Sequence, residues 1–188
     1  VGTLATVIEP GSSEIFEWVE EKRDQGTLVL FDPNVRSAYL SDRTSYRAIV
    51  EKWLGISDVV KASSEDIGWL YPETMEEAVV EKWIGMGVKI AVVTHGGDGM
   101  VGYVEGSRVS VPGIEVSLVD TVGAGDTVGA VLLEAMVEEG LDALLSGSLH
   151  SVLHRASVAA AITCSRQGAN PPTLTELNQF FNRVKRGS

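Results

Sequence analysis

Short hydrophobic runs alternate along this chain with longer stretches in which hydrophobic residues recur every three or four positions. The short runs are typical of buried parallel strands, and the longer stretches predict helices that cover them. The predicted strands are residues 3–8, 27–31, 58–61 and 88–93, with a further run that ends at Val119. The predicted helices lie around residues 15–19, 46–53, 79–83, 130–137, 143–165 and 173–184. Residues 100–104 and 108–111 look like a β-hairpin.

Polar residues and glycines mark the expected ends of these helices. Ser12 or Ser13 and Ser41 fit helix N-caps, and residues 74–77 and 173–176 read as capping boxes. The four tryptophans are predicted to pack between helices; they are Trp18, Trp53, Trp69 and Trp83. The whole pattern predicts one α/β domain over residues 1–188 with a mainly parallel sheet.

Four polar turns follow predicted strands, at residues 32–36, 61–66, 94–99 and 120–126. In an open α/β sheet, ligands bind beyond the carboxyl ends of the strands. We therefore expect these four turns to form one site.

The most informative turn is the glycine-rich one at residues 120–126, which the pattern places between a strand end and a helix start. Such a junction offers unpaired backbone N–H groups and the positive end of a helix dipole, so it favours anions. Asp126 stands beside it and can take a proton from a hydroxyl group while the loop holds a phosphoryl group. The structural alternative for Asp126 is an ordinary helix N-cap.

Two other nucleotide-binding patterns are relevant to the same stretch. The glycines at 123, 125 and 129 resemble a dinucleotide fingerprint, but that site needs a following strand that ends in an acidic residue. Asp142 follows no predicted strand, so the context disagrees. The sequence also lacks the glycine, lysine and serine or threonine pattern of a P-loop.

Polar residues of the other turns have both a structural and a functional interpretation. Asn34 and Arg36 fit a solvated turn, or Arg36 binds a phosphate or carboxylate. Glu65 and Asp66 fit first-turn carboxylates of a helix, or they organise water around Mg²⁺. His150 and His154 share a helix face, but no third metal ligand is evident, which favours a non-metal role.

Charge and cysteine content narrow the choice of partners and compartment. A net charge of −11 and a pI of about 4.7 argue against nucleic acid or an anionic membrane surface as the partner. Cys164 is the only cysteine, which rules out a disulfide within the chain and fits a cytoplasmic protein; we expect it to be buried and inert. No hydrophobic run is long enough to span a bilayer, and no signal peptide is visible.

The sequence DTVGAGD at residues 120–126 resembles the signature of the ribokinase-like, or phosphofructokinase-B, family of carbohydrate kinases. Further similar segments occur in the family's order: GTLA at 2–5, FDPNVR at 31–36, KAS at 61–63, VTHGGDG at 93–99 and RQGA at 166–169. The resemblance implies the three-layer α/β/α fold of that family. It also implies that the N-terminal strands and β lid of other members are not part of this chain, which corresponds to their ATP-binding, catalytic C-terminal part.

The resemblance also implies roles for individual residues. Asp126 resembles the catalytic base, and the N–H groups of Gly123, Ala124 and Gly125 resemble the anion hole for the transferred phosphoryl group. The residues that would contact ATP are Thr94, Gly96, Gly99, Ala159, Ala160, Gly168 and Ala169. Asp66 and Ser63 stand where the family has the glutamate and asparagine of its magnesium-associated motif, so Asp66 would act through water. Asp120 and the Val122 carbonyl match a monovalent-cation site, for which K⁺ is a candidate.

The implied activity is transfer of the ATP γ-phosphoryl group to a primary hydroxyl group of a sugar such as fructose or 2-keto-3-deoxygluconate. Asn34 and Arg36 would contact the substrate or its phosphate, Mg²⁺ would accompany ATP, and a homodimer is a candidate assembly. Two alternatives stay open: a nucleoside kinase of the same family, and a nucleotide-binding fragment without activity of its own.

Overall fold

The structure, a computed structural model, describes residues 1–39 and 41–187, and side chains up to residue 181. The chain divides into two compact units, each described by itself. Unit 1 comprises Val1–Thr94 and Val101–Val109, and unit 2 comprises His95–Met100 and the chain from Ser110 onward. The single domain therefore stays a prediction.

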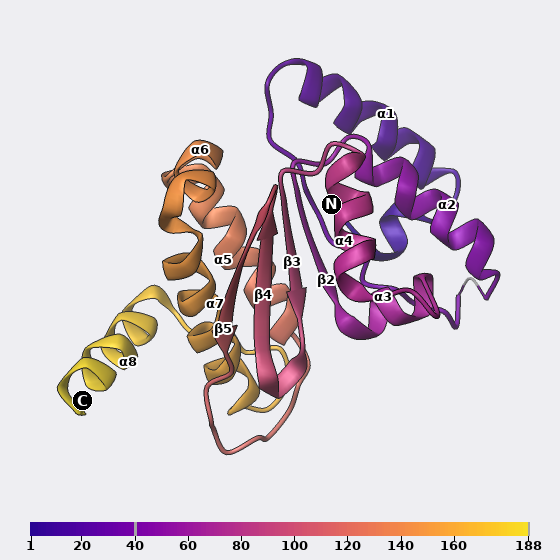
Figure 1. The fold of residues 1–188 in the computed structure, drawn as a ribbon. Coiled ribbons are helices and arrows are strands. Elements are labelled where there is room, and N and C mark those ends of the chain that lie inside the picture. Colours follow the sequence, from indigo (N-terminus) through magenta and orange to yellow (C-terminus); the bar gives the residue numbers. More distant parts are fainter. Residues whose placement is uncertain (40, 188) are drawn as a thin grey trace. The chain divides into compact units, whose positions relative to one another are not determined.

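Five strands form one sheet in the order β1-β2-β3-β4-β5 (Figure 1). β1 (Leu30–Phe31), β2 (Val59–Ser63) and β3 (Ile90–Thr94) are parallel, with Phe31 opposite Val60 and Ala62 opposite Val93. β4 (Gly99–Val104) and β5 (Ser107–Pro112) form the predicted hairpin. All residues of β2 are buried except half-buried Ser63, as expected for a parallel strand covered on both faces. The predicted mainly parallel sheet is confirmed.

The first predicted strand is mostly a helical turn. Gly2 alone bridges to Asp32, and η1 (Thr3–Thr6) is a 3₁₀ turn. Among the other predicted strands, residues 27–29 precede β1 without joining it, although the Val29 carbonyl accepts the N–H groups of Asp58 and Val59.

The α-helices described in unit 1 lie on one side of its strands (Figure 1). They are α1 (Gly11–Asp24), α2 (Arg43–Leu54), α3 (Ser64–Leu70) and α4 (Glu76–Gly85). Trp53 of α2 is 1% exposed and packs edge-on against Phe16 of α1, at 4.9 Å between ring centroids. Its indole N–H donates to the Thr6 carbonyl at 3.2 Å, so its one polar atom is satisfied. Trp18, by contrast, is 58% exposed, so the prediction that it packs between helices is wrong.

Three of the predicted helix caps are wrong because a neighbouring residue takes the position. α1 begins one residue before Ser12, and Ser13 instead bonds to the Glu9 carboxylate. The cap of α2 is Asp42, whose carboxylate accepts the Thr44 N–H at 3.0 Å. α4 begins after Met75 without a side-chain cap.

Unit 2 is built on two long helices that pack along each other, α5 (Ala124–Glu138) and α7 (Leu149–Cys164). α6 (Leu141–Ala143) and a π-helical turn (Leu144–Ser148) connect them, and Gly147 at φ 144° interrupts the predicted continuous helix. α8 (Leu174–Gly187) follows, and its predicted capping box is confirmed by reciprocal bonds between Thr173 and Glu176. No helix among the described residues is both long enough and apolar enough to cross a membrane.

The run that ends at Val119 is not a strand. Leu118 and Val119 are mostly exposed, and the N–H groups of Val119 and Asp120 both donate to the carbonyl of Cys164 at the end of α7. A loop anchored to a helix end therefore leads into α5.

Candidate functional site

The glycine-rich loop of unit 2 ends at Gly123, the N-cap of α5. Gly123 has φ 82° and ψ −1°, in the left-handed region. A Cβ atom there would lie 2.9 Å from the Ala169 Cβ atom and 3.0 Å from the Ala169 Cα atom. Only glycine fits this position, because it meets both the backbone requirement and the close approach of the neighbouring loop.

Asp126 lies in the first turn of α5, exposed and near the positive end of the helix dipole. Since Gly123 is the N-cap, the alternative interpretation of Asp126 as the cap is wrong. The Ala124 N–H already donates to the Thr121 carbonyl at 3.2 Å. The helix geometry therefore directs the amides of Gly125 and Asp126, more than that of Ala124, toward an anion.

A cavity of about 580 Å³ opens beside Asp126. Its walls come from α5, α7, α8 and the segment 169–172, and they are mostly apolar. Four of the predicted site residues line it: Gly123, Asp126, Ala159 and Ala169. Within it, Arg155 and Glu134 form an ion pair at 2.5 Å.

Two buried threonines fix the start of α5 against α7. The Thr127 hydroxyl donates to the Gly123 carbonyl at 2.8 Å and lies 2.9 Å from the Thr163 hydroxyl. Thr163 in turn donates to the Ala159 carbonyl at 3.0 Å. These contacts hold the turn that carries Asp126.

Asp120 ties two loops of unit 2 together. One carboxylate oxygen accepts the Val122 N–H at 3.0 Å and the other accepts the Gly168 N–H at 2.9 Å. These bonds, from Val122 first and then Gly168, hold the pKa of Asp120 below its usual range, so it is ionised. The monovalent-cation site at Asp120 and Val122 stays a prediction.

The other predicted nucleotide-binding residues fall in both units. Gly96, Gly99, Ala160 and Gly168 belong to unit 2, whereas Thr94 ends β3 in unit 1. Gly99 has φ 109°, and a Cβ atom there would lie 2.2 Å from the Val111 carbonyl oxygen. A single site formed from all four turns stays a prediction.

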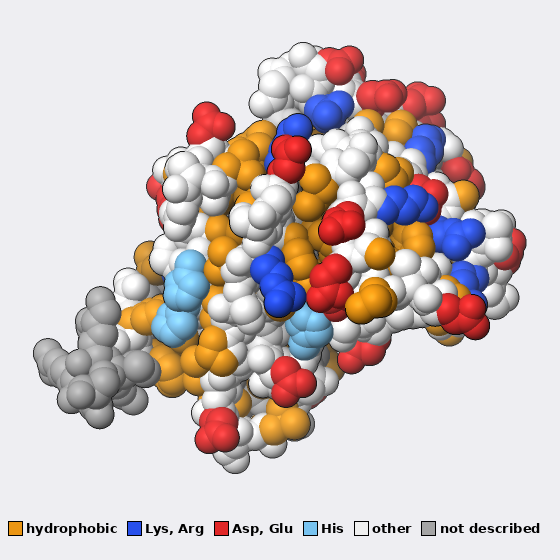
Figure 2. Space-filling model, in the orientation of Figure 1, with side chains coloured by type: hydrophobic (Ala, Val, Ile, Leu, Met, Phe, Trp, Pro, Cys, Tyr) orange, Lys and Arg blue, Asp and Glu red, His pale blue; other side chains and the backbone are white. Residues whose placement is uncertain are grey.

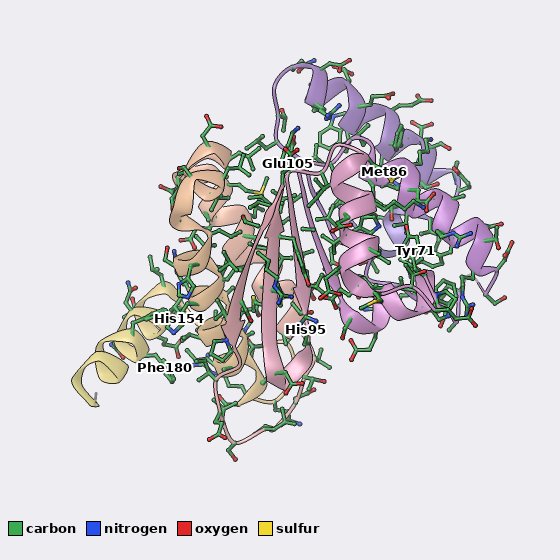
Figure 3. All side chains as sticks on the ribbon, in the orientation of Figure 1. Tyr71, Met86, His95, Glu105, His154 and Phe180 are labelled. Carbon is green, nitrogen blue, oxygen red and sulfur yellow. The ribbon has the colours of Figure 1, made fainter. Side chains whose placement is uncertain are left out.

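Two histidines singled out in the sequence lie on α7. The His154 ring is 5.5 Å from that of Phe181, on α8 beside the labelled Phe180 (Figure 3). His150 is exposed. Among the described residues, no group of three or more histidine, cysteine or acidic side chains could hold a metal.

The loop of residues 32–36 follows β1 in unit 1. Lys61, 5% exposed, forms an ion pair with Asp32 at 2.8 Å. Burial raises the pKa of Asp32, and the Lys61 ammonium opposes that rise. Asn34 has φ 38°, and its amide donates to the Thr3 hydroxyl at 3.0 Å. The Arg36 guanidinium donates to the carbonyls of Asn34 and Val35 and is exposed.

Asp66 is held by the backbone, and its role near a magnesium ion stays a prediction. It is 9% exposed, one of its oxygens accepts the Val35 N–H at 2.9 Å and the other accepts the Ser63 N–H at 3.1 Å. The Ser63 hydroxyl accepts the Asp66 N–H, which completes a capping box for α3. This carboxylate is therefore occupied by the backbone.

Sequence reasoning missed Lys61 as a partner of Asp32. The strand register could have indicated this pair. Phe31 is opposite Val60, so the residues that follow them, Asp32 and Lys61, lie side by side. A lysine between two apolar residues of a buried strand calls for a carboxylate nearby.

Acidic and basic side chains are interspersed on the face drawn in Figure 2. The sequence has 26 acidic residues against 15 lysines and arginines, so the surface field as a whole is negative. Binding of a phosphorylated ligand would therefore depend on local N–H groups and individual cations.

Comparisons with known proteins show the family of this chain. The sequence profile described as "pfkB family carbohydrate kinase" matches residues 5–176. A fructokinase of Rhizobium leguminosarum bv. trifolii is 32% identical over 140 residues, which are 74% of this chain and 43% of that protein. A fructokinase of Vibrio alginolyticus is 30% identical over 186 residues, which are 97% of this chain and 60% of that protein.

Solved structures show the same fold. The fructokinase from Vibrio cholerae O395 in its fructose-, ADP- and calcium-bound form has a TM-score of 0.80 at 26% identity, covering 94% of this chain and 56% of that chain. The fructokinase with bound ATP from Xylella fastidiosa has a TM-score of 0.87 at 24% identity, covering 98% and 61%. The ribokinase-like fold is thus confirmed, and this chain spans about half the length of these relatives.

Proposed function

Because the chain belongs to the pfkB family of carbohydrate kinases, we propose that it carries the ATP-binding and catalytic part of a kinase that phosphorylates a primary hydroxyl group of a sugar. Fructose is the first candidate substrate, since two curated relatives are fructokinases and one solved neighbour holds fructose and ADP.

The observation that carries the proposal is the position of Asp126. It combines an exposed carboxylate, the N-terminus of a 15-residue helix and a cavity of about 580 Å³. In this position Asp126 accepts the proton of the attacking hydroxyl group. The amides of Gly125 and Asp126 and the helix dipole stabilise the negative charge that develops on the transferred phosphoryl group.

We expect ATP to bring Mg²⁺ on its phosphates, where the ion neutralises charge, because magnesium is usually held by substrate phosphates and few protein carboxylates. Gly99, Gly168 and Ala169 have little or no side chain, which favours contact between the nucleotide and the backbone. Gly123 keeps the loop backbone close to Ala169 and so preserves the shape of the anion site.

The test is the substitution Asp126→Asn, with Asp142→Asn as the control because Asp142 is also an exposed first-turn carboxylate of unit 2. For phosphoryl transfer from Mg-ATP to fructose, we expect kcat of Asp126→Asn to fall by about 10²–10⁴. The Kd of Mg-ATP, measured by calorimetry, should stay within about twofold, since Asp126 acts on the proton and does not hold the nucleotide. Asp142→Asn should behave like the unaltered chain.

A near-normal kcat for Asp126→Asn would refute the role of Asp126 as the base. A folded chain that binds no Mg-ATP would contradict the nucleotide site itself. Phosphorylation of nucleosides in place of sugars would keep the mechanism and change the substrate class.

A further inference from the structure

Three consecutive backbone N–H groups in the loop of residues 32–36 each donate to a side chain. The Asn34 N–H donates to the Asp32 carboxylate at 3.0 Å, the Val35 N–H to Asp66 at 2.9 Å and the Arg36 N–H to the Tyr46 hydroxyl at 3.2 Å. The three acceptors come from the loop itself, from α3 and from α2. Two of the three acceptors that set the path of this loop therefore lie outside it, on α2 and α3.

Like Asp32, which also pairs with Lys61, Asp66 accepts hydrogen bonds from two segments. One oxygen holds Val35, and the other accepts the Ser63 N–H at the start of α3. Asp66 and Tyr46 are both buried, so each N–H donates to a group with little access to water. Removal of a buried acceptor leaves its donor unsatisfied, and the loop would have to move.

The loop needs this support because its backbone is unusual. Asn34 lies at φ 38°, in a region that residues other than glycine rarely occupy. Its own N–H is fixed by Asp32, whose second oxygen pairs with buried Lys61. The bond from Val35 to Asp66 then fixes the residue between Asn34 and Arg36.

We propose that Asp66 is a positioning residue, which holds the loop of residues 32–36 against the N-terminus of α3 and does not carry a water molecule of a magnesium ion. Through this loop Asp66 sets the positions of Asn34 and Arg36. That consequence rests on the proposed function, in which these two residues contact the sugar or its phosphate.

The experiment separates this role from simple capping of α3. Asp66→Ala removes the acceptor of both Val35 and Ser63, whereas Ser63→Ala removes only the hydroxyl that accepts the Asp66 N–H. Amide hydrogen exchange, read residue by residue by NMR in the 188-residue chain, is the measurement. Asp66→Asn is the conservative variant, because it keeps one oxygen that can accept a hydrogen bond.

We expect the Val35 amide to exchange at least about tenfold faster in Asp66→Ala, to recover most of its protection in Asp66→Asn and to stay within about twofold in Ser63→Ala. Unchanged exchange at Val35 in both Asp66 variants would overturn the proposal. Equal loss of protection in Ser63→Ala would also overturn it, because capping alone would then explain the effect.

Calorimetry of Mg-ATP tests the metal role with the same variants. We expect the Kd of Asp66→Asn to lie within about twofold of the unaltered chain. If the affinity for Mg-ATP falls tenfold or more in Asp66→Asn but not in Ser63→Ala, the result would support the metal role and overturn the proposal. Absence of Mg-ATP binding by the unaltered chain would count against the proposed function alone, since hydrogen exchange at Val35 still decides the role of Asp66.

Discussion

At the scale of single residues, the ion pair of Lys61 and Asp32 shows how unit 1 accommodates charge in its interior. The Lys61 side chain is 6% exposed and that of Asp32 is 19% exposed, and their charged atoms are 2.8 Å apart. Because the pair also leaves one Asp32 oxygen for the Asn34 N–H, it connects β2 to the loop of residues 32–36. A change at either partner therefore affects both the stability of the unit and the shape of the loop.

We expect Lys61→Met to lower the free energy of unfolding by about 3 kcal/mol, because it leaves the Asp32 charge poorly solvated and unpaired. Lys82→Met is the control. The Lys82 side chain is 50% exposed and pairs with Glu51, so its loss should cost less than about 1 kcal/mol. Urea unfolding at neutral pH measures both values, and Asp32→Asn in the Lys61→Met background should recover part of the loss.

At the scale of secondary-structure elements, the start of α5 requires glycine at position 123. Gly123 combines φ 82° with close contact to Ala169, while Gly129 lies inside the same helix with nothing within 4 Å of its missing Cβ atom. The two glycines therefore have opposite requirements. Gly123 is needed for the backbone geometry, whereas Gly129 weakens a helix that alanine would strengthen.

We expect Gly123→Ala to destabilise the chain by about 1–3 kcal/mol, the usual cost of a side chain in the left-handed region, and to weaken Mg-ATP binding. Gly129→Ala should be neutral or stabilise the chain by up to about 1 kcal/mol. Thermal unfolding followed by circular dichroism compares the two. Equal stability of the two variants would show that the loop relaxes freely around residue 123.

The start of α8 depends on one carboxylate, and this gives it a pH dependence. Hydrogen bonds from the Thr173 backbone first, and then from the Arg166 side chain, lower the pKa of Glu176 to about 2. A lowered pKa in the fold means that the carboxylate stabilises the folded chain at neutral pH, and that this contribution is lost as pH falls toward 2.

We expect the carbon-13 shift of the Glu176 carboxyl group to titrate near pH 2, far below its ordinary value of 4.5. Glu176→Gln should speed amide exchange in the first turn of α8 at pH 6 and have little effect at pH 2, because the carboxyl group is then half protonated or more. Thr175→Ala is a control in the same turn. A titration midpoint near 4.5 would contradict the role of Glu176.

At the scale of the whole molecule, the two compact units differ in composition. All four tryptophans lie in unit 1, at positions 18, 53, 69 and 83. The cluster of buried hydrophobic residues around Trp53 and Trp83 also belongs to unit 1 alone, whereas unit 2 buries the facing sides of α5 and α7. Tryptophan fluorescence therefore reports on unit 1, and circular dichroism reports on the helices of both units.

Because each unit has its own buried residues, we expect the urea transitions seen by tryptophan fluorescence and by far-ultraviolet circular dichroism to have different midpoints. Addition of Mg-ATP should shift the circular dichroism transition to higher urea concentration, since most of the predicted nucleotide-binding residues lie in unit 2. Coincident transitions at every ligand concentration would show that the chain unfolds as one unit.

The sequence predicts what depends on local pattern and fails where distant groups decide. The alternation of hydrophobic segments correctly indicates the central strands, the hairpin and α5, because each segment carries its own periodicity. The pattern predicts Ser41 as the cap where the structure has Asp42, because a pattern cannot show which of two adjacent polar side chains turns toward the helix. Val119 has a strand-like neighbourhood, but its N–H bonds to the end of α7, which local sequence does not encode.

In the candidate site, too, local sequence indicates some residues and misses contacts between distant segments. The sequence pattern alone draws attention to Gly123 and Asp126, because a glycine-rich turn before a helix exposes backbone N–H groups to anions. Their roles in phosphoryl transfer stay a prediction. The occupancy of Asp66 by the Val35 and Ser63 amides is not readable, because it depends on how the loop of residues 32–36 meets α3.

The contact between Gly123 and Ala169 also constrains how this chain can evolve. A side chain at position 123 would press on Ala169, since its Cβ atom would lie 2.9 Å from the Ala169 Cβ atom. A change at position 169, 46 positions along the chain, would relieve only the contact, because φ 82° at position 123 would still strain any other residue. Natural variants should therefore keep glycine at position 123 even where the residue at position 169 differs.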